Sequence, residues 1–367
     1  MQKRMPQFAT IRSGSVNASD TIDVDPYQMQ QKWKKFKLLL LVCFCAVTGF
    51  AQIPFTGPEL FEHGMQHIKD GRLDDALSDF TKAIALLPKS AEAHNSRGVV
   101  YAKLGRDDLA IVDYSKAIQI SPKFETAFYN RGISYKKEGN NDFAFADFST
   151  AIKLTPGYVF AYVHRGALYD EQGKYDLALA DYSAAIKFNP RYAKAYYDRG
   201  ITYRKQGKLD LSITEFTVAI DIEPGYAMAF NNRGSDYFDQ GKTDLAVAGF
   251  TKAVEINPKY AEAYYNLGFI CSKQADYGSA VANYTKAIEI YPRYTDAYYN
   301  RGVSYFGMDK SDLAIADYSH AIEIDPKYVK AYALRAYTHC LAGNRDLALT
   351  DELRTLELGG QLVKKCE

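Results

Sequence analysis

The chain has 367 residues, more than one ordinary globular core holds, which predicts either several domains or a repeat array. Its 45 basic and 44 acidic residues give a formal net charge of +1, so it lacks the basic footprint of a general nucleic-acid binder, and we expect no nucleic-acid partner. Apolar residues make up 47% of the chain, enough for a core that a repeat array would spread along its length.

The N-terminal part differs from the rest of the sequence. An apolar run over residues 38–50 follows four lysines and ends in small residues. A helix of this length spans about 20 Å, against roughly 30 Å of bilayer hydrocarbon, so it is short for a membrane span and suits a secretory signal. We expect a signal peptide over 29–51 and export to the periplasm or the extracellular space.

Two alternatives stay open in this region. Residues 1–28 are either a disordered tail or the product of an over-extended start site. Residues 29–51 are either a cleaved signal or an N-terminal anchor that holds the protein at the membrane through residues 38–50. A membrane contact is expected only through this segment, if it is not cleaved.

Three cysteines follow the predicted signal: Cys271, Cys340 and Cys366. An odd number gives no disulfide framework. Cys271 is expected to be a small buried apolar residue. Cys366 could pair with Cys340 or with another chain.

From residue 57 the sequence repeats every 34 residues without gaps. Within a repeat numbered 1 to 34, Gly at position 8, Ala at 20 and 27, an aromatic residue at 24 and Pro at 32 each recur in eight of nine copies. Positions 4, 8 and 11 share one helical face and positions 20, 24 and 27 another, so each repeat predicts two amphipathic helices. The repeats start at Gly57, Ala91, Glu125, Val159, Ala193, Ala227, Ala261, Thr295 and Val329.

The ends of these helices also have signals. Glycine near position 15 suits a left-handed turn after the first helix, and proline at 32 stops the second. Small residues at positions 8 and 20 allow the two helices to approach closely, and aromatic residues fill the remaining space. A single hairpin cannot bury its apolar face alone, so neighbouring hairpins must stack.

The pattern aromatic-x3-Gly-x2-Tyr, followed by Ala-x3-Tyr-x2-Ala-x4-Pro, resembles the tetratricopeptide repeat (TPR). The resemblance covers residues 57–362 as nine repeats and leaves 363–367 as a tail. It implies an all-α fold, a right-handed TPR superhelix (α-solenoid) of helix-turn-helix repeats whose first helices line the concave face. The ninth repeat departs from the pattern at Glu352 and Thr355, and we expect residues 345–358 to form a polar cap.

Arginine occupies position 7 in seven repeats, and an acidic residue occupies position 23 in seven. If each acid pairs with the arginine of the next repeat, one pair of positions, Gly249 and Leu267, has no charge on either side. Pairing within a repeat also gives six pairs but leaves Arg233 facing Gly249. We predict the pairing between repeats, as a structural tie in preference to an anion-binding track. The six predicted pairs are Arg97–Asp79, Arg131–Asp113, Arg165–Asp147, Arg199–Asp181, Arg233–Glu215 and Arg335–Asp317.

Positions 2, 5, 6, 9, 12 and 13 of the first helices are expected to face the concave groove. Positions 5 and 6 supply mainly phenols and amides. A ladder of amides can bind the backbone of an extended peptide without reading its side chains, and tyrosines add rigid apolar area. The candidate partner-binding residues are Tyr129, Asn130, His164, Tyr197, Asp198, Asn231, Asn232, Tyr265, Asn266, Tyr299 and Asn300.

No catalytic constellation stands out. Gly241-Lys242-Thr243 ends like a phosphate-binding loop, but Asp236 stands where its first glycine must be, and His63 with His67 supplies only two metal ligands. We expect no enzyme activity, no cofactor and no metal. The main hypothesis is a non-catalytic scaffold that binds a protein or extended peptide in its groove. The alternative is a structural, self-assembling component that acts through its ends or convex face.

Overall fold

The computed structural model describes residues 55–364. Within this range the chain forms eighteen α-helices and no strand, arranged as nine consecutive hairpins. The first helices of the hairpins are α2 (Gly57–Lys69), α4 (Ala91–Lys103), α6 (Glu125–Lys137), α8 (Val159–Glu171), α10 (Ala193–Lys205), α12 (Ala227–Asp239), α14 (Ala261–Lys273), α16 (Thr295–Gly307) and α18 (Val329–Leu341). The second helices are α3 (Leu73–Leu86), α5 (Asp107–Ile120), α7 (Asn141–Leu154), α9 (Tyr175–Phe188), α11 (Leu209–Ile222), α13 (Thr243–Ile256), α15 (Tyr277–Ile290), α17 (Ser311–Ile324) and α19 (Arg345–Glu357).

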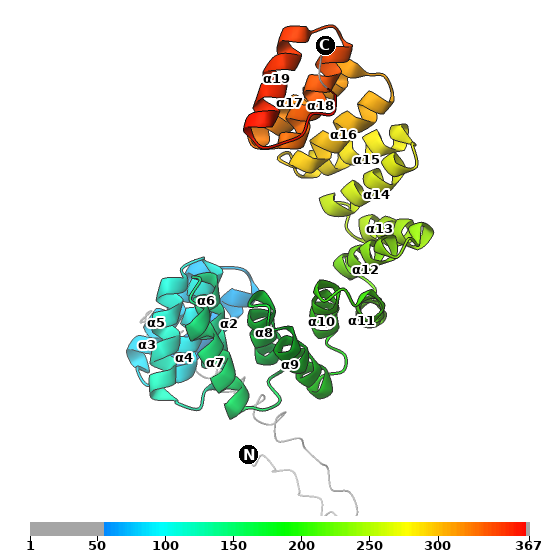
Figure 1. Ribbon diagram of the computed structural model, residues 1–367. Helices are drawn as coiled ribbons and strands as arrows, with labels where there is room; N and C mark the ends of the chain where they lie inside the picture. Colours follow the sequence, from blue (N-terminus) through cyan, green and yellow to red (C-terminus); the bar gives the residue numbers. More distant parts are fainter. Residues whose placement is uncertain (1–54, 365–367) are drawn as a thin grey trace, which may run out of the picture.

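The hairpins stack in chain order into a curved solenoid (Figure 1). Each helix packs on its hairpin partner and on the next helix along the chain. Several first helices also touch the first helix of a neighbouring repeat, as α2 does with α4 and α8 with α10. The first helices therefore lie on the inner side of the curve, and the expected all-α solenoid is confirmed.

Some predictions fall outside the part that the structure describes. These are the signal or anchor over 29–51, the segment 1–28 and any bond of Cys366. Among residues 55–364, no helix combines the length and the apolar character needed to cross a bilayer.

The core of each of the first eight repeats is an aromatic ring packed against a glycine. Phe148 on α7 is fully buried, and a Cβ added to Gly132 on α6 would lie 2.7 Å from its ring. Ala144 and Ala151, one turn to either side of Phe148, are also fully buried. The small residues therefore leave the space that the ring fills, because protein interiors are close-packed.

The helix ends follow the glycine and proline signals. Gly105, after α4, has φ +72°, the left-handed conformation that glycine adopts at little cost. In repeats seven and eight the same turn position holds Ala275 (φ +59°) and Asp309 (φ +58°). Second helices end two residues before the proline: α5 stops at Ile120, and Ser121 is extended because a following proline disfavours helical backbone.

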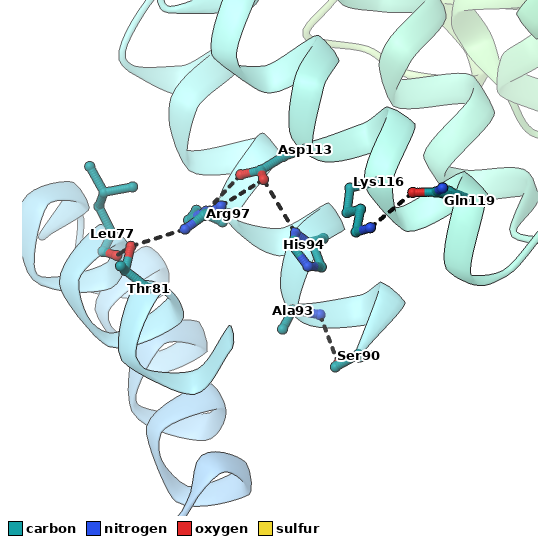
Figure 2. Close-up of polar contacts among 9 residues, drawn as sticks. All are labelled: Leu77, Thr81, Ser90, Ala93, His94, Arg97, Asp113, Lys116 and Gln119. Carbon is teal, nitrogen blue, oxygen red and sulfur yellow. Dashed lines mark hydrogen bonds and ion pairs between the residues drawn. The ribbon is translucent and has the colours of Figure 1, made fainter. Parts of the chain in front are cut away.

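The position-7 arginines pair within their own repeat, so the predicted pairing between repeats is wrong. Arg97 on α4 donates from Nε and Nη2 to the two carboxylate oxygens of Asp113 on α5, at 2.7 and 2.8 Å (Figure 2). Its Nη1 reaches Thr81 Oγ1 on α3 at 3.4 Å. The tie to the preceding repeat is therefore a hydroxyl, while Asp79, the predicted partner of Arg97, contacts His67 Nδ1 at 3.2 Å.

The same arrangement recurs along the solenoid. Arg131, Arg165, Arg301 and Arg335 are bidentate to the aspartate sixteen residues later, and Arg199 binds Glu215. Arg233 is the exception: it faces Gly249, and its buried Nε has no hydrogen-bond partner among the described residues. The arginine missing at Leu267 and the acid missing at Gly249 are therefore not partners of one lost ion pair.

The predicted polar cap at the C-terminal end is also wrong. Glu352 and Thr355 are buried, because positions 24 and 27 face inward in every repeat. Leu349, Leu353 and Leu356 are exposed on α19 instead. The departures from the repeat pattern in α19 thus change the inside of the hairpin and leave its outer face apolar.

Candidate partner-binding groove

The asparagines at position 6 form a ladder that joins neighbouring repeats. The Nδ2 of each donates to the position-5 side chain of the preceding repeat, thirty-five residues earlier. The four bonds are Asn130 to Asn95 Oδ1 (3.0 Å), Asn232 to Tyr197 OH (2.8 Å), Asn266 to Asn231 Oδ1 (3.0 Å) and Asn300 to Tyr265 OH (3.0 Å). At least one amide N–H of each asparagine is thus already used inside the protein, and Asn300 also donates to the carbonyl oxygen of Asp296 at 2.9 Å.

The ladder still leaves acceptors on the groove. Within the described residues, no donor reaches the Oδ1 of Asn130, Asn266 or Asn300. The bond made by Nδ2 fixes the plane of each amide and so directs this oxygen. A fixed acceptor costs less conformational entropy when it binds a donor.

Two of the eleven candidate residues are largely withdrawn from solvent. Asn231 is 0% exposed: its Oδ1 accepts from Asn266, and its Nδ2 donates to Glu262 Oε1 at 3.3 Å. Tyr197 is only 8% exposed. These two side chains support the groove, and the expectation that they present a free surface to a partner is wrong.

The position-5 tyrosines pack against a second tyrosine that the sequence analysis did not select. Their partners occupy position 34, just before the first helix of the next repeat. The ring centroids are 5.3 Å apart for Tyr129–Tyr158, 4.9 Å for Tyr197–Tyr226, 5.0 Å for Tyr265–Tyr294 and 5.5 Å for Tyr299–Tyr328. Recurrence of an aromatic residue at position 34 was the available signal. Burial raises the pKa of Tyr197 and of Tyr265 to about 12, so both phenols stay protonated at neutral pH.

A hollow of about 550 Å³ opens over α4, α6 and α8. Three candidate residues, Tyr129, Asn130 and His164, line it together. Its other lining includes Val99 and Ile133 from position 9 and the exposed Lys103 from position 13. This end of the groove therefore combines an apolar floor with a basic rim.

A second hollow of about 260 Å³ lies over α10, α12 and α14. Tyr265 and Asn266 line it with three phenylalanines: Phe238 from position 12, Phe269 from position 9 and the buried Phe250. Arg204 also lines it, with its Nη1 3.2 Å from Oδ1 of the fully buried Asp236, and neither carboxylate oxygen of Asp236 accepts a hydrogen bond from the described residues. Burial raises the pKa of Asp236. This hollow suits an apolar or aromatic side chain.

Between the two hollows, the first helices of repeats three to five (α6, α8 and α10) carry a belt of charge. Lys136 and Glu171 approach to 2.7 Å, and Lys205 forms an ion pair with Asp170. Asp198 interrupts the asparagine row: it binds Lys194 at 2.8 Å on its own helix. Burial raises the pKa of Asp198.

His164 stands at the edge of this belt as a neutral side chain. Its ring lies 5.6 Å from Tyr129 and 5.7 Å from Phe148, measured between centroids. Burial first, then Lys194 and Lys136, lower its pKa to about 4. At neutral pH it therefore offers an uncharged donor and acceptor to the groove.

Metal ligation has no support in the part that the structure describes, where no three or more His, Cys, Asp or Glu side chains gather in a way that could hold an ion. His63 and His67 turn to different partners: His63 packs edge-on against Phe55, and His67 contacts Asp79.

Family models match the sequence at several places. The model described as TPR repeat matches residues 64–105, 169–207 and 234–274. One model described as tetratricopeptide repeat matches residues 91–124, 261–294 and 295–328. A second model with the same description matches residues 193–226. Together these matches span more than half of the chain. No curated protein matches the sequence.

Solved structures also match the chain. A tetratricopeptide repeat protein from Parabacteroides merdae is 23% identical with a TM-score of 0.53, and the match covers 71% of this chain and 98% of that one. MamA is 29% identical with a TM-score of 0.42, covering 44% and 94%. YrrB, described as a TPR protein with an unusual peptide-binding site, is 24% identical with a TM-score of 0.42, covering 50% and 95%. On its nine helical hairpins and the matches to the family models, the chain belongs to the tetratricopeptide repeat family.

Proposed function

We propose that the protein is a non-catalytic scaffold that binds an extended segment of a partner protein along the inner face of its first helices. TPR proteins are generally protein-interaction scaffolds, which supports a scaffold role. The asparagine ladder supports the binding of an extended segment along the first helices. It holds amide oxygens in fixed positions along the groove, and such acceptors match the regularly spaced N–H groups of an extended backbone.

The two hollows supply the side-chain pockets that such a mode of binding needs. A segment lying across repeats two to seven would place apolar side chains over Ile133 and over Phe269. Between them it would cross the belt of charge around Asp198 and Lys205. The partner segment we propose is therefore apolar at both ends and polar in the middle.

Filling the hollows tests this function. The probe is a phage-displayed library of random 16-residue peptides, selected against the wild-type protein. In the variants Val99→Arg and Ser235→Arg a long charged side chain enters one hollow each, and neither residue belongs to the ladder. We expect each change to weaken binding of selected peptides about tenfold or more, because an apolar group would then meet a buried charge.

The matched controls are Val112→Arg and Leu245→Arg. Both residues are exposed apolar side chains on second helices, outside both hollows. The controls should bind the peptides as the wild type does, and all four variants should keep their thermal midpoint. Equal losses in controls and groove variants, or no selectable peptide at all, would contradict the proposal.

We also propose export of the protein, on the lysine-flanked apolar run at 38–50. N-terminal sequencing of the protein from its native host tests this. A mature chain starting near Gln52 supports a cleaved signal. A membrane-bound chain that keeps residues 38–50 supports the anchor, and a soluble chain that begins at Met1 contradicts both.

A further inference from the structure

The two hollows of the groove differ in charge. Among the described residues, the hollow over α4, α6 and α8 is lined by two lysines, Lys103 and Lys137, and by no acidic side chain. The hollow over α10, α12 and α14 is lined by Arg204 and Asp239, whose Nη2 and Oδ2 lie 3.1 Å apart. The first hollow is therefore positively charged, and the charges of the second compensate each other.

The two lysines belong to a row along the first three repeats. Position 13 is lysine in repeats one, two and three, at Lys69, Lys103 and Lys137. All three residues are exposed. Because stacked repeats bring equal positions side by side, this lysine row follows one edge of the groove over α2, α4 and α6.

The protein itself neutralises the lysine row only in part. Within residues 55–364, Lys69 and Lys103 take part in no ion pair. Lys137 Nζ lies 3.5 Å from Asp107 Oδ2, beyond the usual hydrogen-bond distance, and the lysine side chain is 51% exposed. An exposed contact of this kind is weak, so the positive charge of the row remains available to a partner.

Further along the groove the charges pair with one another. Lys136 of repeat three reaches Glu171 of repeat four at 2.7 Å, and Arg204 of repeat five reaches Asp239 of repeat six at 3.1 Å. The middle of the groove thus carries its own counter-charges. The lysine row differs in that most of its counter-charge must come from outside the described residues.

The hollow beside the lysine row suits a side chain that ends in a carboxylate or that stands next to one. Val99 and Ile133 give it an apolar floor, while Lys103 and Lys137 stand at its rim. His164, which also lines it, is neutral at neutral pH and can donate a hydrogen bond to an anion. Apolar contact and a carboxylate can therefore be satisfied together.

We propose that the partner segment carries aspartate or glutamate next to the apolar residue that enters the first hollow, and that their carboxylates bind Lys103 and Lys137. This inference rests on the proposed function, since it names the chemistry of one end of the segment bound in the groove. It also fixes the direction of the segment: the acidic end lies over α4 and α6. The opposite direction would bring the carboxylates toward Asp239 and leave the lysines without counter-charges.

Charge reversal in the full chain tests the inference. The probes are fluorescent 16-residue peptides taken from the phage selection described above, and we expect them to be richer in Asp and Glu than the library. Lys103→Glu with Lys137→Glu should weaken their binding about tenfold or more at low ionic strength, and less at high salt. Lys103→Glu alone should weaken it about threefold, without disturbing the contact of Lys137 with Asp107.

The matched control is Lys82→Glu with Lys153→Glu. Both are exposed lysines on second helices, α3 and α7, and neither lines one of the two hollows. The control makes the same change in net charge, so it separates local contact with the row from the field of the whole protein. It should bind the peptides within about threefold of the wild type.

A complementary change in the peptide tests the contact directly. Replacing the acidic residues of a selected peptide with lysine should abolish its binding to the wild type and restore binding to Lys103→Glu with Lys137→Glu to within about threefold. A photo-reactive group at the acidic end of the original peptide should crosslink to α4 or α6 and not to α12 or α14.

Three results would overturn the inference alone: selected peptides without an excess of acidic residues, equal losses in the reversed variant and its control, or no recovery with the lysine peptide. Crosslinking of the acidic end to α12 or α14 would overturn the direction. Failure to select any peptide would contradict the proposed function, and the inference with it.

Discussion

Arg131 and Asp147, sixteen residues apart in one repeat, are joined by two hydrogen bonds of 2.8 Å from the guanidinium Nε and Nη2 to the two carboxylate oxygens. The remaining Nη1 donates to Ser115 of the preceding repeat at 3.0 Å. The rings of Phe128 and Tyr135 flank the guanidinium at 5.6 and 5.7 Å. One side chain therefore ties α5, α6 and α7 together, and the carboxylate that it holds is mostly buried.

Removing the charge of this carboxylate should destabilise the protein. We expect Asp147→Asn to lower the free energy of unfolding by about 2–3 kcal/mol, because it leaves a partly buried guanidinium without its counter-charge. A double-mutant cycle of Arg131→Gln with Asp147→Asn should give a coupling energy of at least about 1 kcal/mol. The same cycle with Asp113→Asn is the control and should give a smaller coupling, since Asp113 pairs with Arg97. Urea unfolding measures both coupling energies. A larger coupling of Arg131 with Asp113 than with Asp147 would contradict the pairing within the repeat and support the pairing between repeats.

Supplying the missing acid in repeat six should stabilise it. Among residues 55–364, Arg233 retains only Thr217 Oγ1, at 3.0 Å, as a hydrogen-bond partner. Gly249→Asp places a carboxylate where the other repeats have one, and we expect about 1–2 kcal/mol more stability than Gly249→Ala gives. The alanine variant isolates the fit of the new Cβ, which would lie 3.0 Å from the carbonyl oxygen of Phe230. Thermal unfolding of both variants decides the matter, and no difference between them would contradict the expectation.

Glycine should improve the turn of repeat seven. Ala275 has φ +59°, where its Cβ is strained, while seven of the other eight repeats have glycine at this position. Ala275→Gly relieves the strain at a small cost in unfolded-state entropy, and we expect a gain of about 0.5 kcal/mol. Gln274→Gly, one residue earlier at φ −87°, is the control and should destabilise the protein. A loss of stability in both variants, measured by thermal unfolding, would show that the turn carries no strain.

Acid should weaken the fold through His164. Its pKa is about 4 in the folded protein and 6.5 in the ordinary case, so the unfolded chain binds the proton more readily between these values. Stability from this residue is present above pH 6.5 and is lost as the pH falls toward 4. We expect the wild type to lose about 2 kcal/mol more than His164→Asn between pH 7 and pH 4.5.

Urea unfolding at both pH values measures this difference. Asp198, whose raised pKa acts in the opposite direction, is present in both proteins and cancels in the comparison. His320→Asn is the control, because His320 is an exposed histidine on α17. Parallel pH profiles for the wild type and His164→Asn would contradict the assignment.

The sequence by itself determined the repeating unit. The 34-residue period, Gly132 opposite Phe148, and Gly105 in its left-handed turn follow from local rules, since helical periodicity and allowed backbone conformations act within one hairpin. The groove positions also follow from helical periodicity once the first helices line the inner side.

Only the tertiary structure decided which side chains meet between helices. Both pairing schemes for the arginines gave six pairs, and the choice depended on how far the second helix is rotated about its axis. That rotation turns Asp113 toward Arg97, Thr81 toward the same arginine from the repeat before, and Glu352 inward. It also engages the N–H groups of Asn130 and its counterparts within the groove wall. A repeat pattern fixes which face of each helix is apolar, but the angle at which two faces pack depends on the shapes of the side chains between them.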